Sequence, residues 1–158
     1  MKSLLPKIPL LLMLLLTCST FASPVTEKPR IIVLTDIENE PDDAESMVRF
    51  LTYSNQFDVE GIIATTSVWL RNKTAEWRIH EILEAYKEVQ PKLLEHEPGY
   101  PSFDELRSRT KVGIPKYGMK GVGEGQDSEG SDWIIQALKK EDPRPLWVLA
   151  WGDRKSVV

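Results

Sequence analysis

Three aspartates stand close together near the start of the chain: Asp36, Asp42 and Asp43, with Glu38 and Glu40 between them. Carboxylates this close repel one another and raise one another's pKa. A hard divalent cation removes that conflict, because Ca²⁺ and Mg²⁺ take carboxylate oxygens as ligands. A bound cation also lowers the pKa of a coordinated water and makes it a usable nucleophile. The cluster therefore predicts a divalent-cation site with hydrolytic chemistry.

The elements around the cluster predict where it lies. The apolar run 30–35 is typical of a strand buried on both faces, and Asp36 follows it directly. Asp42 is the expected N-cap of the next helix, with Glu45 completing a capping box. An aspartate at a helix start needs no further explanation than capping. In an open parallel sheet, however, ligands bind beyond the carboxyl ends of the strands, and the strand-end Asp36 favours a functional site there.

Strands and helices alternate along the rest of the chain. Helical spacing places Ala44, Met47, Val48 and Leu51 on one buried stripe. The further elements that we expect are a strand over 59–66, a helix over 74–89 that Pro91 stops, a short helix over 102–109, a helix over 132–140 capped by Ser131 with Ile134, Ile135 and Leu138 on its apolar side, and a buried strand over 146–150. This pattern predicts βαβ units and an α/β fold with an open parallel sheet. Three strands with an open edge do not complete such a domain, so we expect its N-terminal part only.

The first 22 residues have the three parts of a secretory signal: an early basic region, the apolar stretch 8–16 and small residues before a cut after Ala22. The apolar stretch is shorter than the roughly 20 residues of a membrane span, so we expect export without stable membrane insertion. Lipidation at Cys18, the sole cysteine, is an alternative that Thr17 fits poorly. With no other cysteine, the folded part has no disulfide.

The expected boundaries are a signal peptide over 1–22, a linker over 23–29, the α/β domain over 30–152 and a tail over 153–158. The tail reads as a translated sequencing adapter, which predicts an artefact of a truncated gene rather than an ordinary charged end. The net charge of −4 becomes more negative once the signal is removed, and no basic run is present. This charge excludes a footprint for nucleic acid or for an anionic membrane surface.

The motif Thr35–Ala44 resembles the N-terminal acidic motif of the nucleoside hydrolase superfamily. It is most similar to the nucleoside-hydrolase-like domain of secreted bacterial cellulose-binding proteins, as are Tyr53–Thr66 and Pro145–Gly152. The resemblance covers about residues 30–152. It implies a Rossmann-like core and a bound Ca²⁺.

The resemblance also implies roles for single residues. Asp36 matches a metal ligand that activates the attacking water, Asp43 matches a second metal ligand, and Asp42 matches an acid that binds sugar hydroxyls. The implied chemistry is hydrolysis of an N-glycosidic bond through an oxocarbenium-like transition state, with a nucleoside or sugar as the small-molecule ligand.

The sequence departs from nucleoside hydrolases in the turn before the aspartate pair, which is longer and contains Asn39 and Glu40. Those enzymes place an asparagine after the second strand, where this chain reads Thr65 to Trp69. Asn39, Glu40 and Trp69 are therefore the candidate substrate-binding residues, with Trp69 positioned to stack on a sugar or a base. The family's later ligands fall beyond residue 152, so residues 30–152 alone are expected to be inactive.

Two alternatives remain open. One is a non-catalytic carbohydrate-binding module, whose acids bind sugar hydroxyls. The other is a phosphatase of the haloacid dehalogenase type, because Asp36 and Glu38 mimic its first motif, although Glu40 stands where that motif has a threonine. Trp77, Trp133, Trp147 and Trp151 are expected to pack in or against the core. The sequence defines neither the base or sugar nor the oligomeric state.

Overall fold

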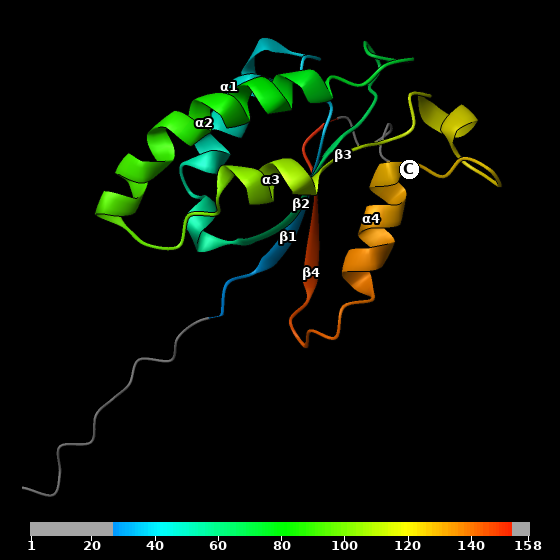
Figure 1. The fold of residues 1–158 in the computed structure, drawn as a ribbon. Coiled ribbons are helices and arrows are strands. Elements are labelled where there is room, and N and C mark those ends of the chain that lie inside the picture. The colour runs from blue at the N-terminus through cyan, green and yellow to red at the C-terminus, as the bar shows by residue number, and fades with distance from the viewer. Residues whose placement is uncertain (1–26, 153–158) are drawn as a thin grey trace, which may run out of the picture.

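One sheet of four parallel strands, in the order β3-β2-β1-β4, forms the centre of the molecule (Figure 1). The strands are β1 (Arg30–Thr35), β2 (Asp58–Ala64), β3 (Thr110–Val112) and β4 (Leu146–Ala150). Every neighbouring pair is parallel, which confirms the predicted α/β class. Both β1 and β4 have the predicted bounds. The prediction of three strands was wrong, because β3 is too short to give an apolar run of its own.

The computed structural model describes residues 27–152. The predicted signal peptide, Cys18, residues 23–26 of the linker and the tail 153–158 lie outside the described residues and stay predictions.

The helices divide between the two faces of the sheet. They are α1 (Pro41–Leu51), α2 (Glu76–His96), α3 (Phe103–Arg109) and α4 (Glu129–Leu138), with short 3₁₀ turns η2 (Ser54–Gln56) and η3 (Gly118–Gly121). The first three pack on one face and α4 covers the other (Figure 1). Within residues 27–152, none of the helices combines the length and the apolar character needed to cross a bilayer.

The connections place a change of direction between β1 and β4. The chain moves from β1 outward to β2 and β3 with its helices on one face, and then returns through α4 to β4 on the other side of β1. The connection that leaves β1 and the connection that would leave β4 therefore start on opposite sides of the sheet order, and the carboxyl ends of these two strands form a topological switch point. In open α/β sheets this is where the ligand crevice forms.

The larger core lies between the sheet and α1, α2 and α3. Its members are Ile31, Val33, Ile37, Met47, Phe50, Leu51, Val59, Ile62, Ala64, Ala75, Ile79, Leu83, Tyr86 and Leu106. Phe50 takes the place expected for Val48, whose side chain is 51% exposed. The smaller core joins α4 to the opposite face through Ala137 and Ile134. Ile135 and Leu138 of α4 were predicted to be buried, but both are exposed.

Helix α1 begins two residues earlier than predicted. Its N-cap is Glu40 rather than Asp42, and Pro41 is the first helical residue. Proline suits that position because its fixed φ is helical and it lacks an N–H that would be left unbonded there. The Asp43 carboxylate, not that of Glu45, accepts a hydrogen bond from the Glu40 backbone N–H at 2.8 Å. The predicted capping box was therefore wrong in register.

Helix α2 does not end at Pro91, contrary to the prediction, and it starts at Glu76 rather than at residue 74. A proline inside a helix removes one backbone hydrogen bond. Here the helix continues to His96, and Leu93, beyond the proline, packs against the larger core. Leu93 is partly buried and gives the helix a tertiary contact beyond the proline.

Helix α4 also starts earlier than predicted. Ser128, not Ser131, is its N-cap, and the two serines form a reciprocal capping box. Glycine at position 130 is required, because a Cβ there would lie 2.6 Å from Cγ2 of Ile63. The absence of a side chain at Gly130 lets the first turn of α4 pack directly against β2.

The edge strand β4 is not buried on both faces, as was predicted. Trp147 is 57% and Val148 45% exposed, since no described element covers the outer side of β4. Trp77 is 50% exposed, so the expected packing of tryptophans was wrong for Trp77 and Trp147. Trp133 and Trp151 do pack: the Trp133 indole donates to the Glu60 carbonyl at 2.7 Å, and Trp151 lies against the larger core.

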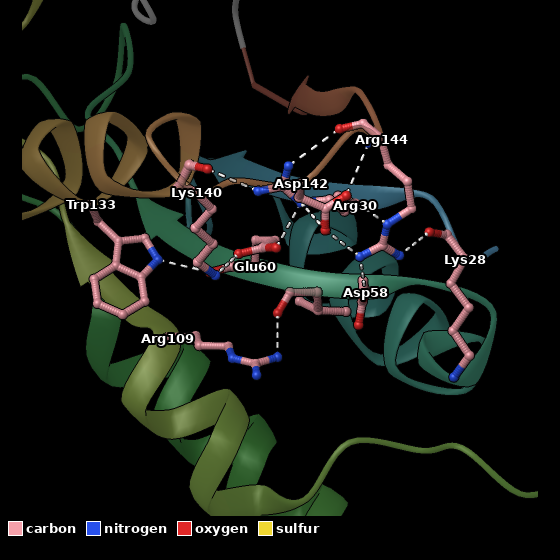
Figure 2. A network of polar contacts seen from close by, with 11 residues as sticks. Lys28, Arg30, Asp58, Glu60, Arg109, Trp133, Lys140, Asp142 and Arg144 are labelled. Atoms are coloured by element: carbon pink, nitrogen blue, oxygen red, sulfur yellow. Dashed lines mark hydrogen bonds and ion pairs between the residues drawn. The ribbon is translucent and has the colours of Figure 1, made fainter.

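A buried ionic network ties the amino ends of β1 and β2 to the end of α4 (Figure 2). Arg30 is 3% exposed, and its Nε donates to Glu60 at 2.9 Å. Lys140 pairs with the other Glu60 oxygen, and Arg144 pairs with Asp142 at 2.7 Å. This network lies at the strand ends opposite those that Asp36 follows.

The network predicts loss of stability in acid. Burial alone would raise the pKa of Glu60, but hydrogen bonds from Lys140 and Arg30 bring it below its ordinary 4.5. The hydrogen bond from Arg144 lowers the pKa of Asp142 below its ordinary 3.8. A carboxyl group whose pKa is lowered by folding stabilises the fold at any pH above its ordinary pKa. That stability is lost as the pH falls through the lowered pKa of the folded state.

We therefore expect the urea midpoint to fall as the pH is lowered below about 4.5. Asp142→Asn should flatten part of that decline, whereas Asp104→Asn, at an exposed position of α3, should leave it unchanged. Urea titrations at a series of pH values measure this, and parallel declines in all three proteins would contradict it.

Candidate functional site

Asp36 follows β1 directly, at the carboxyl end of the sheet beside the switch point. Its side chain is buried, with 2% of the residue exposed. Gly152, which follows β4, lies directly against it: a Cβ on Gly152 would be 2.2 Å from Asp36 Oδ1. The backbone of Trp151 is fixed beside β1, where its N–H donates to the Leu34 carbonyl at 2.9 Å. The ends of β1 and β4 thus enclose the Asp36 carboxylate between them.

The loop after Asp36 is a tight turn under backbone strain. The Asn39 N–H donates to the Asp36 carbonyl at 3.0 Å. Within residues 27–152, Glu38 is the one non-glycine residue with a positive φ, at 73°. That conformation costs an ordinary residue about 1–2 kcal/mol. Strain of this kind is kept where surrounding contacts impose it, often at functional sites.

Helix α2 supplies one of those contacts. Arg78 Nε lies 2.7 Å from Glu38 Oε1, and the Arg78 guanidinium also donates to Glu81 at 3.0 Å. The pair is about one-third exposed, so solvent screens it. The pair holds the Glu38 side chain toward α2.

Ser67 ties the acidic loop to the loop after β2. Its buried hydroxyl donates to Asn39 Oδ1 at 2.6 Å and accepts hydrogen bonds from the backbone N–H groups of Trp69 and Leu70 at 3.3 and 3.1 Å. The predicted substrate residues Asn39 and Trp69 are therefore joined through one side chain. Trp69 itself is 74% exposed and free to meet a ligand with its ring.

Ser67→Ala should loosen this junction. The change removes the hydrogen bond to Asn39 and leaves two backbone N–H groups without their acceptor, which costs about 1–3 kcal/mol. We expect a lower urea midpoint and faster hydrogen exchange at the amides of residues 69 and 70. Ser108→Ala, at an exposed hydroxyl of α3, is the matched control. Equal effects of the two changes would show that Ser67 has no special role.

Asp43 and Asp42 lie at the start of α1 but differ in their surroundings. Asp43 is half-buried and lines a hollow of about 460 Å³, whereas Asp42 is exposed. The other residues that line the hollow are Thr35, Ser46, Arg49, Phe50, Tyr53, Phe57 and Trp151. The Trp151 and Phe50 rings meet edge to face, with centroids 5.3 Å apart. Aromatic faces beside polar groups are suited to a sugar, which presents C–H faces as well as hydroxyls.

The predicted cation site stays a prediction. Asp36 and Asp43 supply carboxylate oxygens of the kind that Ca²⁺ prefers, but Ca²⁺ takes six to eight oxygens. Among residues 27–152, no group of three or more His, Cys, Asp or Glu side chains lies close enough to hold a metal ion. One Asp43 oxygen is also engaged by the Glu40 N–H. Carboxylates are the type of donor that calcium takes, and calcium binding by Asp36 and Asp43 stays a prediction.

The structure brings together most of the residues predicted from the sequence. Asp36, Asn39 and Glu40 share one short loop, and Asp43 follows in the first turn of α1. The backbone of Trp69 is linked to Asn39 through Ser67. The sequence analysis missed Ser67, Arg78 and Gly152. The strand-end rule that identified Asp36 also applies to Ser67 and Gly152, since each follows a strand. Arg78, in the first turn of a helix, gave no such signal.

Comparison with known proteins agrees with this geometry. The family model described as "Cellulose-binding Sde182, nucleoside hydrolase-like domain" matches residues 30–158. A solved structure from Saccharophagus degradans, described as a nucleoside hydrolase-related hypothetical protein associated with carbohydrate metabolism, is 42% identical, with a TM-score of 0.76. The similarity covers 79% of this chain and 30% of that one, so the chain spans less than a third of that structure's length. No curated protein matches the chain.

Proposed function

The chain belongs to the nucleoside-hydrolase-like domain family of cellulose-binding Sde182, and from this premise we propose that the whole protein is exported and hydrolyses an N-glycosidic bond of a ribosyl or related sugar compound. The observation that supports the proposal is the buried Asp36 carboxylate after β1, which lies against Gly152 after β4. Export is supported by the signal pattern of residues 1–22 and by the cellulose-binding description of the family.

Each predicted residue has a place in the proposed reaction. Asp36 accepts a proton from the attacking water as the water oxygen bonds to the anomeric carbon. The electrons of the broken C–N bond pass to the leaving nitrogen, which takes up a proton from solvent. Asp42, exposed at the start of α1, accepts hydrogen bonds from sugar hydroxyls. Asn39 and Glu40 border the sugar, and the exposed Trp69 ring stacks on the sugar or the base.

The proposal includes calcium, with Asp36 and Asp43 as two of its ligands. Groups outside the described residues and water molecules supply the rest of the shell. When bound, the ion lowers the pKa of a coordinated water. Asp43 keeps its second role, as the acceptor that fixes the start of α1.

Sugar release from ribonucleosides by the full-length protein in calcium-containing buffer tests the proposal. Asp36→Asn should lower the rate by about 10²–10⁴-fold, the contribution of a general base. Asp104→Asn, an exposed aspartate of α3, should leave the rate unchanged. Turnover by Asp36→Asn at the rate of the unchanged protein would contradict the role of Asp36.

A carbohydrate-binding module is the second candidate, and the aromatic hollow lined by Phe50, Tyr53, Phe57 and Trp151 favours it. In that case cello-oligosaccharides bind, Tyr53→Ala weakens binding, and no nucleoside is hydrolysed. The same assays therefore separate the two functions, because hydrolysis depends on Asp36 and simple sugar binding depends on the aromatic rings.

A further inference from the structure

Two loops that leave neighbouring strands are tied together at the carboxyl edge of the sheet. Residues 65–75 follow β2, and residues 113–123 follow β3, the strand beside it (Figure 1). The Tyr117 N–H donates to the Arg71 carbonyl at 2.9 Å, and the Arg71 guanidinium carbon lies 5.5 Å from the centroid of the Tyr117 ring. Ser67 joins the first loop to the acidic turn. These two segments, the loop pair, therefore border the candidate site on the β2 side.

The loop pair carries positive charge that no acidic residue of its own balances. Its charged residues are all basic and all exposed: Arg71, Lys73, Lys116 and Lys120. Within residues 27–152, no carboxylate forms an ion pair with any of them, and the Lys116 ammonium donates to a neutral amide, that of Gln126, at 2.7 Å. Lys111, in β3, does pair with Glu129 at 3.0 Å. The chain as a whole has a net charge of −4, so the loop pair is a local surface that attracts anions on an acidic protein.

Arg71 is held in place while its two terminal nitrogens stay open. Its Nε donates to the Val68 carbonyl at 2.8 Å, and its guanidinium lies over the Tyr117 ring. Its Nη1 and Nη2 form no hydrogen bond or ion pair with residues 27–152. A guanidinium with two open N–H groups matches a phosphate, which it binds through two parallel hydrogen bonds. Because the side chain is already ordered, less conformational entropy is lost when an anion binds.

An exposed aromatic ring lies two residues before Arg71. Trp69 is 74% exposed, and its backbone N–H donates to Ser67 Oγ at 3.3 Å. Two residues of chain span at most about 7 Å, so one small molecule can contact both side chains. Tryptophan rings stack on nucleic-acid bases, because every base has a flat π face. An aromatic ring beside an ordered guanidinium and further lysines therefore matches a base that is joined to a phosphate.

The charge distribution favours a small ligand over a polymer. The net charge of −4 repels a long polyanion, whereas a single phosphate meets only the local positive charge of the loop pair. The acidic turn contains carboxylates, which repel a phosphate. The phosphate of a bound ligand should therefore face the loop pair, while its ribose points toward Asp36.

We propose that the ligand of the candidate site is a nucleoside monophosphate, whose base stacks on Trp69 and whose phosphate is bound by Arg71, Lys73 and Lys120. The inference rests on the proposed function, since it concerns the same ribosyl compound, and adds the phosphate that a nucleoside lacks. The loop pair would then be the part of the site that distinguishes a phosphorylated ligand from a neutral one.

Calorimetric titration of the full-length protein, without added calcium, compares adenosine 5′-monophosphate (AMP) with adenosine and uridine 5′-monophosphate with uridine. We expect at least one monophosphate to bind roughly tenfold more tightly than its nucleoside. Arg71→Gln should remove that advantage, and Lys73→Gln, at an exposed position, should reduce it about threefold. Trp69→Ala should weaken the binding of the monophosphate and of the nucleoside alike. Lys139→Gln removes an exposed, unpaired lysine at the end of α4 and should leave all affinities unchanged.

Three results would overturn the proposal. The first is that neither monophosphate binds more tightly than its nucleoside, or that none of the four compounds binds. The second is that inorganic phosphate binds as tightly as AMP, which would make the loop pair a site for a simple anion. The third is an affinity for oligoadenylate that rises with its length, which would make the loop pair a surface for single-stranded nucleic acid.

Failure of the proposed hydrolysis gives a different result. Asp36→Asn should keep the preference for the monophosphate, because the phosphate is bound by the loop pair and not by Asp36. If the unchanged protein prefers the monophosphate but releases no base from it, the proposed hydrolysis is contradicted and the proposed ligand is supported.

Discussion

Gly152→Ala is expected to displace the Asp36 carboxylate and to abolish the function of the crevice. The new Cβ would lie 2.2 Å from Asp36 Oδ1 and 2.4 Å from its Cγ, far inside van der Waals contact. Asp36 is buried and cannot move away without disturbing its neighbours. Overpacking of this kind costs about 1–3 kcal/mol. The rate of nucleoside hydrolysis should fall as far as it does with Asp36→Asn, because the same carboxylate is lost from its position.

The same substitution at Gly118 is an informative control. A Cβ on Gly118 meets nothing within 4 Å, but its φ of +67° strains any other residue. Gly118→Ala should therefore lower the urea midpoint slightly and leave hydrolysis unchanged. If Gly152→Ala kept full activity, the close contact with Asp36 would have no functional meaning.

Arg30→Met is expected to be the most destabilising single change in the ionic network. Arg30 donates to Glu60 at 2.9 Å, to the Ala137 carbonyl at 2.8 Å and to the Arg144 carbonyl at 3.2 Å. Removing one partner of a buried ion pair leaves the other charge without compensation and costs about 3–5 kcal/mol. Lys140 still pairs with Glu60, so we expect the free energy of unfolding to fall by an amount near the lower end of this range. Urea unfolding followed by tryptophan fluorescence measures it.

Arg107→Met provides the matched control. Arg107 pairs with Glu84 at 3.4 Å, and both side chains are about half exposed. Pairs of this kind contribute at most about 1 kcal/mol. Similar losses from the two changes would mean that burial of the Arg30 pair contributes nothing to its strength. Neither change should alter hydrolysis, because Arg30 begins β1, at the end opposite Asp36, and Arg107 is a half-exposed residue of α3.

The sequence predicted the features that follow from burial of a strand inside the sheet. The bounds of β1 and β4 were predicted correctly because their apolar runs are continuous. The position of Asp36 followed from the strand-end rule, which needs only the end of one strand and a parallel sheet. Burial could not be predicted for Trp147, because exposure depends on whether another element covers β4.

The sequence was a poor guide where several residues compete for one local role. Asp42 and Glu40 both precede helical residues, and Pro41 decided the register by taking the first helical position. Proline normally ends a helix, but α2 continues past Pro91 to His96, and the partly buried Leu93 contacts the larger core. The contact of Gly152 with Asp36 depends on the order of the strands in the sheet. It could not be predicted, because strand order cannot be derived from a single sequence.

Calorimetric titration of Ca²⁺ into the full-length protein tests the central claim most directly, namely that Asp36 and Asp43 form the metal-binding part of the crevice. We predict binding at one site, lost in Asp36→Asn and kept in Asp104→Asn. Equal calcium binding by the unchanged protein and by Asp36→Asn, or no binding by either, would contradict it.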